Sequence, residues 1–228
     1  MGTQDLRYRR WRVIARRHPS AFLLAAQLAS LVTYPLLEGD TGRVLFGAFG
    51  VVIAALAVWV VMRSPAVKSV AWIIAVPAVL LSVIAVLSPG SGVGLVATLL
   101  EASLYFYAAA SLTGYMLSDH RVTSDELFAA GATFTLLMWA FAYAFVACQS
   151  IYPDAFTGVV EPERPRTWME LLFLSATNLS ATGLGDVLPI HPAARVLVVL
   201  EQICGVGYLA VVVSRLIGLT VAAERRVP

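Results

Sequence analysis

The stretch SATGLGD, residues 180–186, decides the fold, because two glycines alternate in it at Gly183 and Gly185. Glycine reaches left-handed backbone dihedral angles that other residues adopt only at a cost. We expect both glycines to use this freedom, and replacement of either one by alanine to abolish the role of the loop. A backbone of this kind can turn successive carbonyl oxygens to one side. Four such loops around an axis would surround a desolvated cation with rings of oxygen.

A short helix is predicted immediately before this loop. Thr167 and Glu170 have the spacing of a capping box, which places the helix start near Trp168. The apolar run 171–174 gives the helix a face to bury. The helix is too short to cross a bilayer, so it is predicted to be re-entrant, which is tolerated only inside protein or beside water. Its carbonyl end would then favour a cation at mid-membrane.

Composition requires a membrane around this segment. Hydrophobic residues make up 59% of the 228 positions and charged residues only 13%, whereas a soluble domain is about 25% charged. A spanning helix needs ~20 apolar residues. Six stretches qualify, and they predict an all-α protein with six transmembrane helices: 20–37, 44–62, 69–87, 93–117, 127–152 and 194–219.

The basic residues predict the orientation. With six spans both termini lie on one side, and positive charge favours the cytoplasmic side. Twelve basic residues then lie inside: Arg7, Arg9, Arg10, Arg12, Arg16, Arg17, Arg63, Lys68, Arg121, Arg215, Arg225 and Arg226. The four outside are Arg43, Arg164, Arg166 and Arg195. We therefore expect cytoplasmic termini and a cell-membrane location, and we read the N-terminal arginines as a lipid-facing segment, not as a nucleic-acid site.

The loop and the helix after it resemble a known family. Residues 177–189 are similar to the pore loop and filter of potassium channels, and the resemblance extends over about residues 127–219. It implies that Ala181, Thr182, Gly183, Leu184, Gly185 and Asp186 form a selectivity filter in a homotetramer. The last helix resembles the inner helix of bacterial two-helix-pore channels at Arg195, Leu197, Leu200, Glu201, Gly205, Tyr208, Leu209, Val212 and Arg215.

Three positions depart from the family pattern. Ala181 stands where the family usually has Thr, Thr182 where it has Val, and Leu184 where it has an aromatic residue. The first change removes a ring of hydroxyl groups, and the last removes a side chain that braces the filter from behind. The resemblance therefore implies cation conduction, of K+ and with relaxed selectivity also of Na+.

Two glycines in the last helix suggest a gate. Gly205 and Gly207 lie about twenty residues after the filter, and glycine in a helix interior costs ~1 kcal/mol relative to alanine. They mark either close packing against the short helix or a hinge, and the resemblance favours a hinge at Gly205. Val211, Val212 and Leu216 could then close the pore by dewetting.

The first four helices, residues 1–126, are predicted to form a unit separate from the pore domain, residues 127–228. A charged voltage sensor needs regularly spaced arginines, and residues 93–117 contain no Arg or Lys. Glu101 is the ionisable residue of that stretch. It is either functional or a hydrogen-bonded acid near the outer boundary, and we favour the second interpretation.

Two other functions compete with a channel. The run 183–186 also matches the Gly-x-Gly-Asp motif of intramembrane aspartyl proteases, but that chemistry needs a second aspartate inside a span, and the sequence offers none. A non-conducting membrane scaffold or transporter is the other alternative, although no inverted repeat is evident. We expect no enzyme activity, no cofactor, and no bound metal other than the permeant monovalent cation.

Overall fold

The protein is helical along almost all of the chain that the structure describes. The computed structural model describes residues 19–34, 39–62, 64, 66–88, 92–118 and 124–224. Each predicted apolar stretch forms a helix. In chain order these helices are α2 (Pro19–Thr33), α3 (Gly39–Val61), α4 (Lys68–Leu87), α5 (Val93–Ser118), α6 (Ser124–Ile151) and α8 (Pro192–Glu224).

Four segments are long and apolar enough to cross a membrane, namely Lys68–Leu87, Val93–Ser118, Asp125–Ile151 and Pro192–Arg215. The protein is therefore an integral membrane protein. Pro19–Thr33 and Phe49–Val61 are shorter apolar helices. At 1.5 Å per residue, the first spans about 22 Å, less than the ~30 Å hydrocarbon core. A count of six spans thus stays a prediction.

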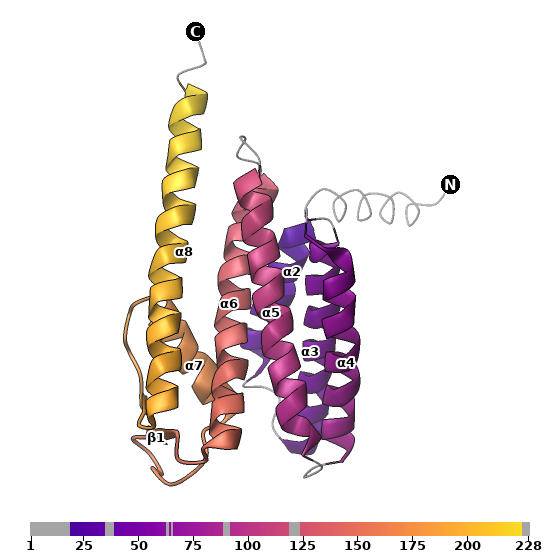
Figure 1. The fold of residues 1–228 in the computed structure, drawn as a ribbon, viewed down its shortest axis with the longest axis vertical. Helices are drawn as coiled ribbons and strands as arrows, with labels where there is room; N and C mark the ends of the chain where they lie inside the picture. Colours follow the sequence, from indigo (N-terminus) through magenta and orange to yellow (C-terminus); the bar gives the residue numbers. More distant parts are fainter. Residues whose placement is uncertain are drawn as a thin grey trace, which may run out of the picture.

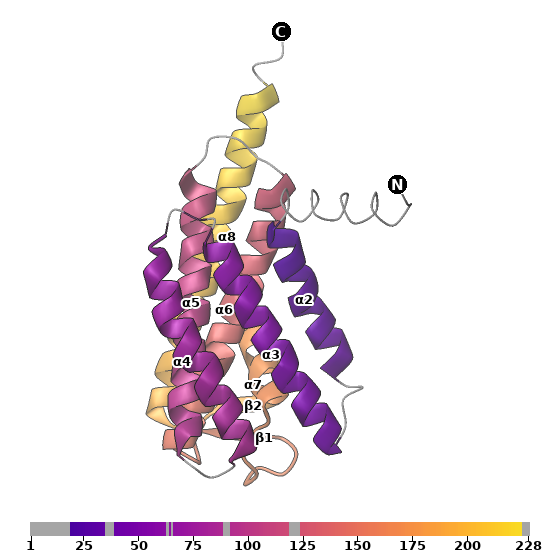
Figure 2. The same cartoon turned by 90° about the vertical axis from the view of Figure 1, so that its right-hand side faces the viewer.

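Helix α6 lies at the centre of the arrangement. Helices α2 and α5 pack on one side of it and α7 (Trp168–Leu179) and α8 on the other (Figure 1). Figure 2 shows α2, α3 and α4 on the face turned away from α8. Aromatic rings fill the centre: Trp139 of α6 makes edge contacts with Tyr105 of α5 at 5.9 Å and with Trp168 of α7 at 5.2 Å. The first four helices and the α6–α8 unit therefore share one core.

Polar contacts fix α2 and α8 against α6. Gln27 is fully buried and accepts a hydrogen bond from the hydroxyl of Thr135 at 2.7 Å. Arg215 of α8 pairs with the buried Glu126 at 3.6 Å. In the sequence Thr123 and Glu126 have the spacing of a capping box, but Thr123 lies outside the described residues.

A small sheet is the one departure from the all-α prediction within the described residues. Strands β1 (Phe156–Gly158) and β2 (Val187–Pro189) pair antiparallel, with Phe156 opposite Pro189. Phe156 is buried against Phe145 of α6, with ring centroids 5.4 Å apart. The sheet joins the chain before α7 to the chain after the glycine loop, so it closes the loop into a fixed frame.

Only some of the basic residues used to predict the orientation lie in the described part of the structure. The N-terminal arginines, Arg63, Arg121, Arg225 and Arg226 lie outside the described residues. Lys68 begins α4 and Arg215 lies in the last part of α8, at the upper end in Figure 1. Arg164 and Arg195 lie near the strands at the lower end. The predicted sidedness of the termini stays a prediction.

Candidate functional site: the loop after the short helix

The start of α7 is fixed by the predicted capping box. The backbone N–H of Glu170 donates to the hydroxyl of Thr167 at 3.3 Å, and the backbone N–H of Thr167 donates to the Glu170 carboxylate at 2.6 Å. Arg164 adds an ion pair to Glu170 at 2.9 Å. Burial raises the pKa of Glu170, but the hydrogen bonds from Thr167 and Arg164 outweigh it and lower that pKa below its ordinary value. The helix begins at Trp168, which confirms the prediction.

The loop before α7 is organised around Arg166. Its side chain is 1% exposed and donates to the carbonyl oxygens of Val160 at 3.1 Å, Glu161 at 2.5 Å and Arg164 at 2.8 Å. Gln149 of α6 adds reciprocal hydrogen bonds to the Arg166 backbone, at 2.8 and 2.9 Å. The loop is thereby held against α6 ahead of the short helix.

At the C-terminal end of α7, the first residues of the glycine loop turn back and donate hydrogen bonds to the helix. The N–H groups of Thr182 and Gly183 both donate to the carbonyl oxygen of Thr177, at 3.0 and 3.1 Å. Ala181 has a φ of 58° and Gly183 a φ of 68°. A left-handed residue just after a helix lets the following N–H groups turn back onto its last carbonyls. The chain therefore turns sharply out of α7 at Ala181.

This geometry corrects one prediction about the glycines. Gly183 is left-handed as expected, but Gly185 does not have a positive φ, and Ala181 takes the left-handed position instead. The reason is the turn out of α7, which requires the left-handed residue directly after the helix. The spacing of the glycines in the sequence does not reveal that requirement.

The six predicted filter residues, 181–186, form one continuous exposed stretch of the single chain. Leu184 is 70% exposed. The stretch is held at both ends: Thr177 accepts the two hydrogen bonds described above, and the carbonyl oxygen of Asp186 accepts one from the N–H of Val159 at 3.0 Å. It is therefore an exposed segment in a fixed frame.

Three contacts hold α8 against the last two turns of α7. Ser175 contacts Glu201, and Gln202 donates to the side-chain oxygen of Asn178 at 3.1 Å. Gly205 packs so closely that an added Cβ would lie 2.1 Å from the carbonyl oxygen of Leu179. We call these three pairs the α7–α8 clamp. It ends two residues before Ala181, so α8 fixes the position from which the loop starts.

The carboxyl group of Glu201, which makes the first contact of the clamp, is fully buried. The hydroxyl of Ser175 lies within hydrogen-bonding distance of Glu201 and also of the carbonyl oxygen of Met138, at 2.8 Å for the second. A hydroxyl has one proton to donate. Both contacts are therefore satisfied together when the carboxyl group donates to Ser175 and Ser175 donates to Met138.

Sequence reasoning missed most of the clamp. Glu201 and Gln202 are polar residues within the apolar run 196–213 of the sequence, but neither Ser175 nor Asn178 was singled out. Their spacing of three places both on one face of α7. The prediction that Leu171, Leu172 and Leu174 would be buried is confirmed, whereas Phe173 is 49% exposed.

The short helix α7 and the framed loop lie between the two long membrane helices α6 and α8. Residues 129–222 match the family model described as "Ion channel". Over 74 residues the chain is 36% identical to the inward rectifier potassium channel Kirbac3.1 of Paramagnetospirillum magnetotacticum. The match covers 32% of this chain and 22% of that relative. No solved structure matches the chain.

These comparisons confirm the resemblance to potassium-channel pore domains. They also point to a channel and not to an enzyme, which agrees with the prediction that the Gly-x-Gly-Asp run does not mark an intramembrane aspartyl protease.

Proposed function

We propose that four copies of this chain form a channel that conducts K+ passively through a central pore, with residues 181–186 as the selectivity filter. The observation that carries this proposal is the framed loop: an exposed segment directly after a short helix, held by Thr177 at one end and by Val159 at the other. The relative that shares 36% identity is a potassium channel by name. The pore requires no cofactor.

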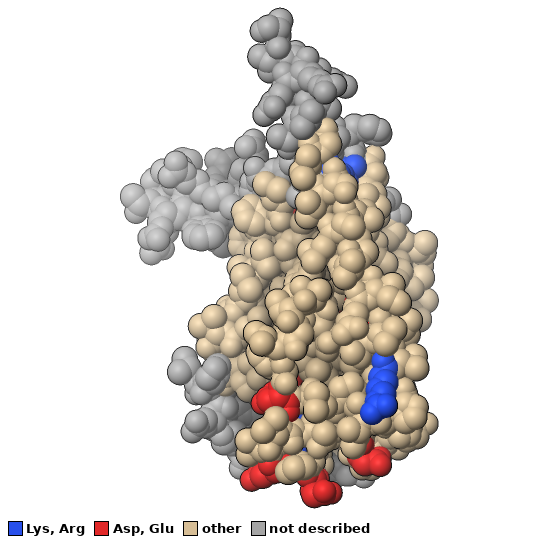
Figure 3. Space-filling view, turned by 90° about the vertical axis from the view of Figure 1, so that its left-hand side faces the viewer, with Lys and Arg blue, Asp and Glu red and all other residues tan. Residues whose placement is uncertain are grey.

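The proposed tetramer is supported by the surface of α8. Figure 3 shows that the α8 side of the molecule is largely free of charged groups between its two ends. Ile203, Val206 and Val213 are among the exposed large hydrophobic side chains there, each at least 49% exposed. One copy supplies one loop, and a ring of oxygens around a cation needs several. Contact between copies through this side would bring the four loops together on one axis.

In the membrane, we propose six spans with a re-entrant α7 and both termini on the cytoplasmic side of the cell membrane. Capping at Thr167 and the sharp turn at Ala181 let α7 enter and the chain leave on the same side. The strands and the loop around Arg166 then face outward. The short lengths of α2 and of the apolar part of α3 are compatible with local thinning of the bilayer around them.

Selectivity is proposed to be relaxed. Ala181 supplies no hydroxyl group, and Leu184 supplies no polar or aromatic brace. The hydroxyl of Thr182 is already engaged with Ser180 at 3.1 Å and with the carbonyl oxygen of Thr177 at 3.2 Å, so it supports the turn out of α7. These three side chains give the loop fewer fixed contacts than the family pattern implies.

For the gate, we propose a division of roles between the two glycines. Gly205 lies against Leu179, so the close-packing explanation accounts for it, and the hinge is assigned to Gly207, where an added Cβ meets nothing within 4 Å. Tyr208 anchors α8 one residue later, through a hydrogen bond of 2.7 Å to the carbonyl oxygen of Ala130. Val211 is exposed and Val212 is buried, which favours Val211 as the constricting side chain of the two.

Ion flux through purified protein in liposomes tests the proposal. We expect K+ efflux from vesicles that contain the wild-type protein and a mass of four subunits in detergent. Gly183→Ala, which forces a side chain into a left-handed conformation, should abolish the flux, and the matched control Gly114→Ala should keep it, because its Cβ also meets nothing within 4 Å. A folded tetramer without flux would favour a non-conducting scaffold, and a conducting monomer would refute the proposed pore.

A further inference from the structure

A cavity lies among the N-terminal helices, away from the framed loop. Its volume is about 460 Å³, and α3, α4 and α5 line it together with Tyr143 of α6. Small-molecule sites commonly have volumes of ~300–1,000 Å³. Small residues such as Ala78 leave the space open, and an added Cβ at Gly50 or Gly94 would meet nothing within 4 Å. The helices are thus packed around a space of ligand size.

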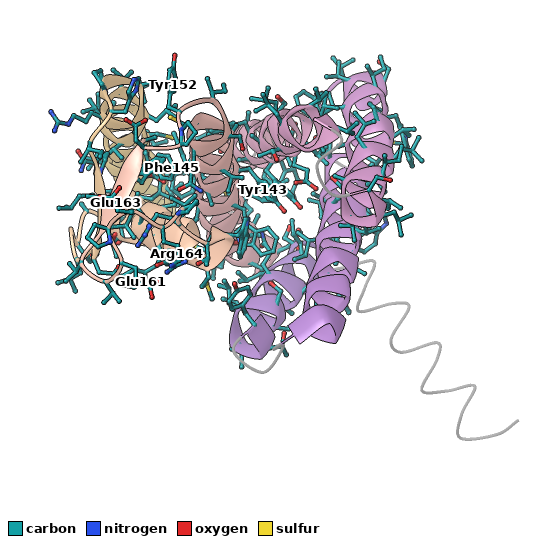
Figure 4. The ribbon with its side chains drawn as sticks, turned by 90° about the horizontal axis from the view of Figure 1, so that it is seen from below. Tyr143, Phe145, Tyr152, Glu161, Glu163 and Arg164 are labelled. Carbon is teal, nitrogen blue, oxygen red and sulfur yellow. The ribbon has the colours of Figure 1, made fainter. Side chains whose placement is uncertain are left out.

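One carboxyl group is directed into this mostly apolar space. Glu101 accepts a hydrogen bond from the hydroxyl of Ser82 at 2.5 Å, and the side chain of Tyr143 forms a second hydrogen bond with it. Figure 4 shows Tyr143 on the side of α6 that faces the N-terminal helices. Among the described residues that line the cavity there is no Lys or Arg. The carboxyl group therefore has two hydroxyl partners but no basic one in the wall.

We propose that this cavity binds a lipid-soluble primary amine, with the ammonium group on Glu101 and the hydrocarbon body along α3 and α4. A charge away from water needs a counter-charge and further hydrogen bonds. An ammonium group donates three hydrogen bonds, and the Glu101 carboxylate and the oxygens of Ser82 and Tyr143 can accept them. The remaining wall is apolar, which suits an alkyl body.

Access from the hydrocarbon layer is open. Val51 of α3 and Val83 and Val86 of α4 line the cavity and are at the same time 37–45% exposed. An amphiphilic amine dissolved in the bilayer can therefore enter between α3 and α4 without passing through the pore. The site is distinct from the proposed filter and does not depend on conduction.

Photolabelling in lipid nanodiscs tests this site. The probe is an octylamine with a diazirine on its alkyl chain, compared with an octanol that carries the same diazirine. We expect the amine to label peptides of α3 and α4, and excess plain octylamine to prevent this labelling while octanol does not. Glu101→Gln should reduce labelling by the amine about thirtyfold, because loss of one partner of a desolvated charge pair costs at least about that factor in affinity.

A second pair of variants separates occupancy of the cavity from damage to the fold. Gly94→Leu places a side chain in the cavity and should remove labelling, whereas Gly114→Leu, in open space on the same helix and outside the lining, should keep it. Equal labelling by amine and alcohol, or undiminished amine labelling in Glu101→Gln, would overturn the proposal. Because labelling and not ion flux is measured, a failure of the proposed channel leaves this test intact.

Discussion

Replacement of Gly205 by alanine is the most direct test of the α7–α8 clamp. The added Cβ would lie 2.1 Å from the carbonyl oxygen and 2.9 Å from the Cα of Leu179, whereas ordinary contact begins at 3.4 Å. The two backbones must therefore separate by the difference between 3.4 and 2.1 Å, about 1.3 Å. Neither side can yield by rotation of a side chain, because the obstacle is backbone.

The energetic balance in each subunit is unfavourable. Overpacking of a well-packed contact costs about 1–3 kcal/mol, occasionally more, and alanine in a helix interior recovers about 1 kcal/mol relative to glycine. The net destabilisation is up to about 2 kcal/mol per subunit. Leu179 lies two residues before Ala181, so the separation also moves the start of the filter. We expect a lower melting temperature of the tetramer and reduced K+ flux together.

Gly207→Ala is the matched control. Its Cβ meets nothing within 4 Å, so it should raise the melting temperature slightly, because it keeps the helix-propensity gain of about 1 kcal/mol without the clash. Single-channel recordings should show unchanged conductance and rarer openings if Gly207 is the hinge. If Gly205→Ala instead melts like Gly207→Ala and keeps the wild-type K+ flux, the clamp does not position the filter and our reasoning is wrong.

Three further predictions concern the loop and its frame. Gly183→Ala should reduce K+ flux far more than Gly185→Ala, because only the former has a left-handed φ; equal losses in vesicle flux would mean that the assembled loop differs from the single chain. Leu184→Tyr should raise K+ selectivity over Na+ in reversal-potential measurements. Ala181→Ser should raise it further, because it restores a hydroxyl group without placing a β-branched side chain at φ 58°. A wild-type filter already selective for K+ would contradict both predictions. The lowered pKa of Glu170 stabilises the fold above the ordinary pKa of a glutamate, and this contribution is lost as the pH falls through the lowered value. The melting temperatures of wild type and Glu170→Gln should therefore differ at pH 7 by the equivalent of about 0.5–1 kcal/mol and converge once the pH falls below the lowered pKa of Glu170. A difference independent of pH would refute the role of the charge.

Local signals allowed much of the fold to be predicted from the sequence. Each of the six apolar runs corresponds to a helix, because length and hydropathy are properties of one segment. The start of α7 was predicted near Trp168, where the structure has it, since the capping box joins Thr167 and Glu170 within a single turn. The glycines led to the prediction that residues 181–186 form a filter, and that role stays a prediction.

Contacts between distant segments could not be predicted in this way. Strands β1 and β2 are three residues each and come from either side of α7, so neither shows an alternating pattern long enough to recognise. The left-handed position of Ala181 follows from the turn onto the carbonyl oxygen of Thr177, not from a preference of alanine. The Asn178–Gln202 contact depends on how α8 lies against α7, which sequence periodicity does not specify.

The buried position of Arg166 has a consequence for the electrostatic potential at the proposed outer entrance. Its guanidinium group is buried, donates to carbonyl oxygens of the loop and lies 3.6 Å from the Glu170 carboxylate. Its charge is therefore largely withdrawn from solvent, while Glu161, Glu163 and Asp186 remain exposed. Figure 4 shows Glu161 and Glu163 at this end of the molecule, with Arg164 close by. Four such entrances around one axis would form a ring of negative potential that raises the local cation concentration. At low ionic strength, where the Debye length grows to ~30 Å, the current should therefore fall less steeply than the bulk salt concentration.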